Sequence, residues 1–134
     1  MPAQNQRTCT AARGDTDTCE LYCFNEDLVY RLRRHLPQGQ VLDGVATFFS
    51  ALGSRTRLLV LYCLCHAEEL CVCDIANALR MNLSTISHQL RYLRGLGLVT
   101  YRSQGRMAFY RLADSRVKEL IRAELAPPVA CSPT

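Results

Sequence analysis

The sequence contains no tryptophan and no apolar run long enough to cross a membrane. Its longest apolar run, Leu58 to Cys65, has eight residues, whereas a membrane-spanning helix needs about 20. The first 20 residues are polar and carry charges such as Arg7 and Asp15, so they lack the apolar segment of a secretory signal peptide. These absences predict a cytoplasmic protein with no membrane partner.

Catalytic motifs are missing as well. The sequence contains no phosphate-binding loop, no paired-carboxylate motif and no cysteine placed with a histidine as nucleophile and base. We therefore expect a protein that is not an enzyme and has no small organic substrate. With 134 residues, 49% hydrophobic and 21% charged, the chain is neither collagen-like nor wholly disordered and has the size of one domain.

The unusual feature of the composition is the eight cysteines. Their share lies below the roughly 8–10% that marks a small disulfide scaffold. In a reducing compartment, clustered thiols bind metals or sense redox state more often than they form structural disulfides. The cysteines are therefore candidates for a metal site or a redox site.

Apolar spacing along the chain predicts a mainly helical fold with one small β-hairpin. Two short β runs, 98–102 and 107–112, are joined by a turn in which Gly105 supplies a positive φ. Ser54 and Asn82 are the expected caps of the helices that follow them. The predicted helices cover residues 25–35, 41–52, 55–65, 72–79, 83–96 and 114–125.

This order of helices and hairpin predicts a winged helix-turn-helix in residues 19–126. Residues 1–18 are expected to form a flexible N-terminal arm, and residues 127–134, which begin with Pro127, a disordered tail. The second helix of the pair should bury one apolar stripe, which consists of Leu83, Ile86, Leu90 and Leu93.

Positive charge is concentrated on the predicted helix-turn-helix and wing. Residues 74–112 carry six arginines against one acid, a net charge of +5, although the whole chain has only +4. Such asymmetry is typical of a domain that binds double-stranded DNA. The alternative is a solvated helix face beside a hairpin that only packs. The candidate DNA-binding residues are Ser84, Thr85, Ser87, His88 and Arg91 on the second helix and Arg106 at the wing tip.

Two cysteine pairs are candidates for a shared metal site. Cys71 and Cys73 stand where a helix should begin, so that extended backbone lets both thiols reach one ion and the helix dipole lowers their pKa values. One pair supplies two ligands, whereas a tetrahedral thiolate site for a soft ion needs about four. Cys19 and Cys23, in segment 19–24 ahead of the first helix, can supply the others. Four thiolates favour Cd²⁺ and Pb²⁺, with Zn²⁺ tolerated.

The other cysteines have simpler interpretations. Cys63 and Cys65 lie in the most apolar predicted helix, where a buried thiol behaves as a small hydrophobic side chain. Cys9 and Cys131 have no assigned role. For Cys19 and Cys23 the alternative is an unstructured arm without a site.

Three segments resemble the ArsR/SmtB family of metal-responsive winged-helix repressors: Glu69–Ala76 (ELCVCDIA), Ser84–Leu90 (STISHQL) and the wing after them. The segment Asp17–Phe24 (DTCELYCF) and the acidic residues that follow it are similar to the CadC-type branch, the cadmium and lead sensors. The resemblance runs from about residue 17 to residue 122. It implies a homodimer whose first and last helices form the interface, and a thiolate site of Cys19, Cys23, Cys71 and Cys73.

The resemblance fails at one place. Many family members carry a second site, for zinc, in the last helix, with an Asp-x-His pair on one protomer and a second pair, His-x-x-Glu/His, on the other. Here Asp114 keeps the first position, but Arg116 stands in place of the histidine, and Pro127 and Ala130 occupy the positions of the second pair. Because a guanidinium cannot ligate zinc, we predict that this zinc site is absent.

The function implied by these features is a repressor that binds operator DNA as the apo homodimer and is released when Cd²⁺ or Pb²⁺ binds. Two regulators on the same scaffold remain as alternatives. One responds to thiol oxidation, and the other to arsenite or antimonite, which need three thiolates. A thiol-based enzyme or metal-buffering protein is a further alternative, which sequence-specific DNA binding would exclude.

Overall fold

A computed structural model describes residues 7–11 and 21–125 of the chain. Its contacts divide into two units, Met1–Asp43 and Gly44–Thr134, and each unit is described by itself. The predicted metal ligand Cys19 and the predicted tail 127–134 lie outside the described residues.

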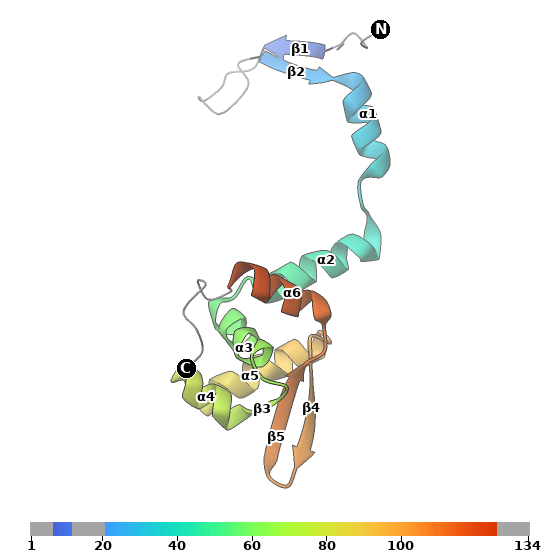
Figure 1. Cartoon of the computed structure of the whole chain (residues 1–134). Helices are drawn as coiled ribbons and strands as arrows, with labels where there is room; N and C mark the ends of the chain where they lie inside the picture. Colours follow the sequence, from blue (N-terminus) through green and yellow to red (C-terminus); the bar gives the residue numbers. More distant parts are fainter. Residues whose placement is uncertain (1–6, 12–20, 126–134) are drawn as a thin grey trace. The chain divides into compact units, whose positions relative to one another are not determined.

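The first unit contains a β-hairpin followed by a helix (Figure 1). Strand β1 (Arg7–Ala11) pairs antiparallel with β2 (Leu21–Asn25). Neither strand was predicted from the sequence. Helix α1 (Glu26–His35) begins as predicted, because the Asn25 side chain accepts a hydrogen bond from the Leu28 N–H at 3.1 Å. Acidic residues in its first turn and basic residues in its last turn suit the helix dipole.

Helix α2 (Gly39–Leu52) begins two residues before its predicted start, and α3 (Arg55–Cys65) follows it after a break of two residues. Ser54 caps α3 as predicted, since its hydroxyl accepts a hydrogen bond from the Arg57 N–H at 3.5 Å. Within the described residues no single helix is long and apolar enough to cross a membrane. Only α2 and α3 taken together reach that length and composition, and they meet at a bend of 87°.

The helix-turn-helix consists of α4 (Val72–Leu79) and α5 (Leu83–Gly95). Helix α4 ends at Arg80, which has a left-handed backbone with φ of 53°. Asn82 takes the N-cap position of α5 as predicted, but its side chain makes no capping hydrogen bond there. The prediction that Leu83 belongs to the buried stripe of this helix is wrong, because its side chain is 51% exposed. It is the first residue of α5 and has no preceding turn to cover it.

The wing is the hairpin of β4 (Val99–Gln104) and β5 (Met107–Leu112), which extends away from the helices of its unit in Figure 1. A two-residue strand, β3 (Leu70–Cys71), pairs with the other side of β5, so that the sheet has the order β3-β5-β4. Helix α6 (Ser115–Glu124) then packs against α3. The fold is therefore mainly helical with a small antiparallel wing, which confirms the predicted fold class.

The core lies where α3, α5, α6 and the base of the sheet meet. Its fully covered side chains come mainly from leucine, isoleucine and valine positions of the predicted apolar stripes. Packing of this kind holds α5 and the wing in a fixed relation. The largest fully buried side chains are Leu61, Leu64, Ile75, Ile86, Leu90, Leu93, Val60, Val99 and Val117.

Candidate metal centre and DNA interface

Cys71 and Cys73 lie where strand β3 turns into helix α4. Cys71 is the N-cap of α4 with extended backbone, φ of −76° and ψ of 156°, as the sequence predicts. Its N–H donates to Asp74 Oδ2 at 3.1 Å, and the Cys73 carbonyl accepts from Asn77 Nδ2 at 2.8 Å. Backbone pairing and these side-chain bonds fix the two cysteines in position.

The two thiols differ in accessibility but contact each other. Cys71 is 3% exposed, whereas Cys73 lies on the surface. Four effects raise the pKa of Cys73. In order of size they are the hydrogen bond that its thiol donates to the Cys71 sulfur, the negative charge of the Cys71 thiolate, burial and the Asp74 carboxylate. The predicted lowering by the helix dipole is therefore wrong for Cys73. A metal ion that binds here has to displace protons.

The second predicted pair is only partly described. Cys19 lies outside the described residues, and Cys23 lies on β2, opposite Cys9 in the register of the hairpin. Cys23 is disulfide-bonded in the structure, so binding of a metal by its thiolate requires prior reduction. Among the described residues, no group of three or more His, Cys, Asp or Glu side chains is arranged to hold a metal ion.

Cys63 and Cys65 are half-buried on α3. Burial raises the pKa of both thiols, and for Cys65 the charges of Arg122 and Lys118 oppose that rise. Cys65 packs against the core. Both thiols therefore favour the protonated form, in agreement with a packing role.

Arg116, at the position where the resemblance would place a zinc-binding histidine, is bonded to Asp114. Its Nη2 donates to Asp114 Oδ2 at 2.6 Å, and its guanidinium carbon lies 4.4 Å from the centre of the Phe48 ring. The Arg116 hydrogen bonds hold the pKa of Asp114 below its ordinary value. Asp114 also caps α6, since it accepts from the Arg116 N–H at 2.8 Å.

The predicted DNA-binding residues lie on the side of α5 away from the core. Ser84, Thr85, His88 and Arg91 are exposed, and Ser87 is half-buried. Arg91 is held along the helix by a bond from its Nε to the Ser87 carbonyl at 3.3 Å. The opposite side of α5 is buried through Ile86, Leu90 and Leu93. Helix α5 is thus anchored on one side and presents hydroxyls, an imidazole and a guanidinium on the other.

Arg106 occupies the tip of the wing as predicted. The strands close on the Gln104–Met107 pair, and Gly105 supplies the positive φ, 60°, that the turn requires. The Arg106 side chain is exposed. The tip therefore offers a cation that can contact a DNA phosphate or groove next to the one that α5 would enter.

Arg57 joins three elements, a role that was not predicted from the sequence. Its Nε donates to the Ala51 carbonyl at 2.6 Å and its Nη2 to the Ser50 carbonyl at 3.1 Å, at the end of α2. On α5, its Nη1 reaches Gln89 Oε1 at 3.4 Å, and its guanidinium lies 4.7 Å from the Tyr92 ring centre. No short-range motif marks these partners. Only the basic side chain after the Ser54 cap could have suggested a bond to the last carbonyls of α2.

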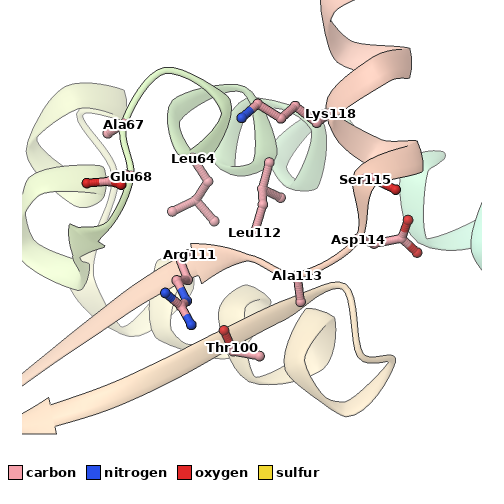
Figure 2. A pocket seen from close by; sticks show the side chains of 10 residues that line it. All are labelled: Leu64, Ala67, Glu68, Thr100, Arg111, Leu112, Ala113, Asp114, Ser115 and Lys118. Atoms are coloured by element: carbon pink, nitrogen blue, oxygen red, sulfur yellow. The ribbon is translucent and has the colours of Figure 1, made fainter.

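An open cavity of about 560 Å³ lies between α3, the base of the wing and the start of α6 (Figure 2). Figure 2 shows charged side chains of both signs around it. The lining holds no cysteine or histidine, so this cavity is separate from the thiol pair. It is lined by Leu64, Ala67, Glu68, Thr100, Arg111, Leu112, Ala113, Asp114, Ser115 and Lys118.

Comparisons with known proteins agree with this geometry. Residues 54–101 match the model of the arsR family of bacterial regulatory proteins. The chain is 41% identical over 105 residues to a Staphylococcus aureus cadmium resistance transcriptional regulatory protein, a CadC homolog, and the match covers 78% of this chain and 86% of that protein. It is 44% identical over 108 residues to a Synechocystis SmtB homolog, a transcriptional repressor, with 77% and 81% covered.

Among solved structures, a homodimeric winged helix-turn-helix DNA-binding domain from Mycobacterium bovis is 37% identical. The matched region covers 64% of this chain and 82% of the Mycobacterium bovis chain, with a TM-score of 0.57. That domain has the winged helix-turn-helix architecture described above, and the two relatives are transcriptional regulators rather than enzymes. The chain belongs to the arsR family of bacterial regulatory proteins, whose members are DNA-binding transcriptional regulators.

Proposed function

We propose that this protein is a metal-sensing repressor that binds double-stranded operator DNA as the apo homodimer in the cytoplasm and leaves it when Cd²⁺ or Pb²⁺ binds. Zn²⁺ is a weaker candidate inducer. The observation that carries the proposal is the pair of contacting thiols, Cys71 and Cys73, at the start of the helix that precedes α5. The relative named for cadmium resistance supports it.

In the proposed site, Cys19 and Cys23 complete a four-thiolate set with Cys71 and Cys73. Four sulfur ligands suit a soft ion, which is why Cd²⁺ and Pb²⁺ are preferred over ions that bind oxygen. Resident metal would bridge segment 19–24 to the start of α4. The set forms only with all four cysteines reduced.

Homodimerisation is supported by apolar side chains that one chain leaves uncovered. On α1, none of the residues is buried, and Leu28, Leu32 and Leu36 next to it are 42%, 55% and 57% exposed. A stripe of this kind at helical spacing is typical of a surface that packs against a partner. The related Mycobacterium bovis domain is homodimeric.

Release from DNA requires that the metal binds the free dimer more tightly than the DNA-bound dimer. A coupling of this kind is typically about 1–3 kcal/mol, which corresponds to a 5- to 150-fold change in DNA affinity. The apo dimer would read DNA with the exposed side of α5, including His88 and Arg91, and with Arg106 on the wing.

The proposal can be tested by fluorescence anisotropy with a duplex selected from a random-sequence library by the reduced apo protein. Cd²⁺ or Pb²⁺ should weaken binding by the factor given above, while Mg²⁺ should not. Cys71→Ser and Cys73→Ser should keep apo DNA affinity and lose the response. The control Cys63→Ser, a half-buried thiol on α3, should respond normally. An unchanged DNA affinity in Cd²⁺ would refute the proposal.

The DNA-reading residues should give the opposite pattern. Replacing Arg91 or His88 by alanine should weaken apo binding, by about 1–3 kcal/mol where the side chain contacts a base edge. The same variants should retain the ultraviolet sulfur-to-cadmium absorption of the wild type. A variant that loses both properties has lost its fold and says nothing about DNA contact, so circular dichroism accompanies each titration.

A redox-responsive regulator is the second candidate, and the disulfide at Cys23 is the observation that favours it. Thiol titration separates the candidates. Loss of four reactive thiols on addition of Cd²⁺ supports the metal sensor, and loss of three on addition of arsenite supports a sensor of trivalent ions. DNA release by peroxide, with no effect of any metal on the reduced protein, supports the redox regulator. Absence of sequence-specific DNA binding would leave a metal-buffering protein.

A further inference from the structure

An ion pair connects the segment that carries Cys71 to the far strand of the wing. Glu69 immediately precedes β3, and Arg102 lies on β4. Arg102 Nε donates to both carboxylate oxygens of Glu69, at 3.1 and 2.9 Å, and its Nη2 donates to Oε1 as well. Because β5 lies between β3 and β4 in the sheet, this bidentate pair spans the central strand from one side to the other.

Phe109 of β5 lies beneath this bridge. The guanidinium carbon of Arg102 is 4.7 Å from the centre of the Phe109 ring. In the register of the sheet, Phe109 is opposite Cys71 on one side and opposite Arg102 on the other. The candidate metal ligand, the ring and the guanidinium therefore occupy one row across the three strands.

The row continues toward the tip of the wing. Arg102 Nη1 donates to Gln104 Oε1 at 2.9 Å, and Gln104 belongs to the last strand pair before the turn that carries Arg106. Contacts thus run without a gap from the Cys71 strand, through Glu69, Arg102 and Gln104, to the wing tip. An open hollow of about 280 Å³ beside the bridge, lined in part by Thr100 and Arg111, leaves room for these side chains to rearrange.

We propose that Glu69 and Arg102 are positioning residues that transmit occupation of the thiolate site to the wing. The inference rests on the proposed function and adds how metal binding reaches the DNA-binding surface. A ligand shifts a conformational equilibrium only through contacts that differ between the two states. Backbone pairing joins β3 to β5 over just two residues, Leu70 and Cys71. The Glu69–Arg102 bridge is the side-chain connection that carries a displacement of β3 directly to β4.

The Glu69–Arg102 pair contributes little to the stability of the fold, so its role in coupling can be tested without unfolding the protein. The side chains of Arg102 and Glu69 are 52% and 30% exposed, and an ion pair on the surface adds little to stability because water and salt screen it. Removing it should leave the protein folded and the four cysteines in place. The effect should appear in the coupling between metal and DNA.

The measured quantity is the ratio of the DNA Kd in Cd²⁺ to the DNA Kd of the reduced apo protein, obtained with the full chain and the selected duplex. In Glu69→Ala and in Arg102→Ala we expect this ratio to fall at least threefold below that of the wild type. The sulfur-to-cadmium absorption should be retained, which shows that the site is still occupied. Glu68→Ala is the matched control, because Glu68 has the same charge one residue earlier and its side chain is exposed.

Two further variants distinguish coupling from other roles. The double variant Glu69→Ala/Arg102→Ala should lower the ratio no more than either single change, and the exchanged pair Glu69→Arg/Arg102→Glu should restore part of it. Equal ratios in wild type, Glu69→Ala and Arg102→Ala would overturn the inference, and a loss of apo affinity in Arg102→Ala alone would then indicate a direct phosphate contact. If the wild type itself does not respond to Cd²⁺, the proposed function fails and the inference fails with it.

Discussion

Replacing Arg57 with methionine should lower the free energy of unfolding by about 2–3 kcal/mol, the sum of a few named contacts. Arg57 donates to two carbonyls in the last turn of α2, at 2.6 and 3.1 Å. Hydrogen bonds from a charged donor contribute about 1.5–3 kcal/mol each when buried. Ala51 is buried, so the bond to its carbonyl falls in this range, whereas Ser50 is exposed and water can replace the donor there. About 2 kcal/mol for both bonds is therefore the appropriate estimate.

The guanidinium of Arg57 adds a smaller contribution on the side of α5. It lies 4.7 Å from the centre of the Tyr92 ring, and a cation–π contact at an exposed site is worth about 0.5–1 kcal/mol. Methionine keeps an apolar stem of similar length, so that the packing of the Arg57 methylenes is largely retained. The charge is therefore what the substitution removes.

Urea unfolding followed by circular dichroism measures this loss. Both proteins have to be compared at one protomer concentration, because the stability of a dimer depends on it. Arg55→Met is the matched control, since Arg55 is an exposed arginine on the same helix. We expect a control effect within about 0.5 kcal/mol. Equal destabilisation by the two substitutions would refute the assignment of Arg57 as the link between α2 and α5.

Two further predictions concern helix ends. Asp114→Ala removes the acceptor of the Arg116 N–H at the start of α6 and should cost about 1 kcal/mol in the same urea assay. Because the pKa of Asp114 is lowered by Arg116, its charge stabilises the fold above the ordinary aspartate pKa, and this contribution is lost as the pH falls through the lowered folded value. The gap between wild type and Asp114→Ala should therefore narrow in acid, and a constant gap would contradict the ion pair. Arg80→Gly relieves a left-handed backbone with φ of 53° and should raise stability by up to about 1 kcal/mol, so a lower urea midpoint would contradict the strain.

Helices could be predicted from the sequence because their signals are local. Ser54, Asn25 and Asp114 mark the starts of α3, α1 and α6, and in the structure each side chain accepts a hydrogen bond from a backbone N–H of the first turn. The wing was predicted for the same reason, since Gly105 lies between two runs of β-forming residues. In each case the deciding contacts lie within a few residues of the signal.

Strand β3 could not be predicted, because its partner is distant in the sequence. Leu70 pairs with Tyr110 and Cys71 with Phe109, and nothing in the two-residue segment Leu70–Cys71 indicates that pairing. The Glu69–Arg102 bridge was missed for the same reason, as its residues are 33 positions apart. Leu83 shows an error of another kind. The helical period of the apolar residues was correct, but it was extended to the first residue of α5, which no other part of the fold covers.

For the candidate site, spacing predicted that Cys71 and Cys73 lie together, but it did not predict how differently they are held. Cys71 is 3% exposed and is fixed by β3 and by the bond from its N–H to Asp74, whereas Cys73 lies at the surface. In the proposed thiolate site, Cys71 and Cys73 are thus held in place before the metal arrives. Assembly of the site then requires segment 19–24 to be brought to the start of α4, which costs conformational entropy. Metal affinity should depend on the redox state of Cys23 and on the length of that segment, while the coupling to DNA depends on what β3 contacts.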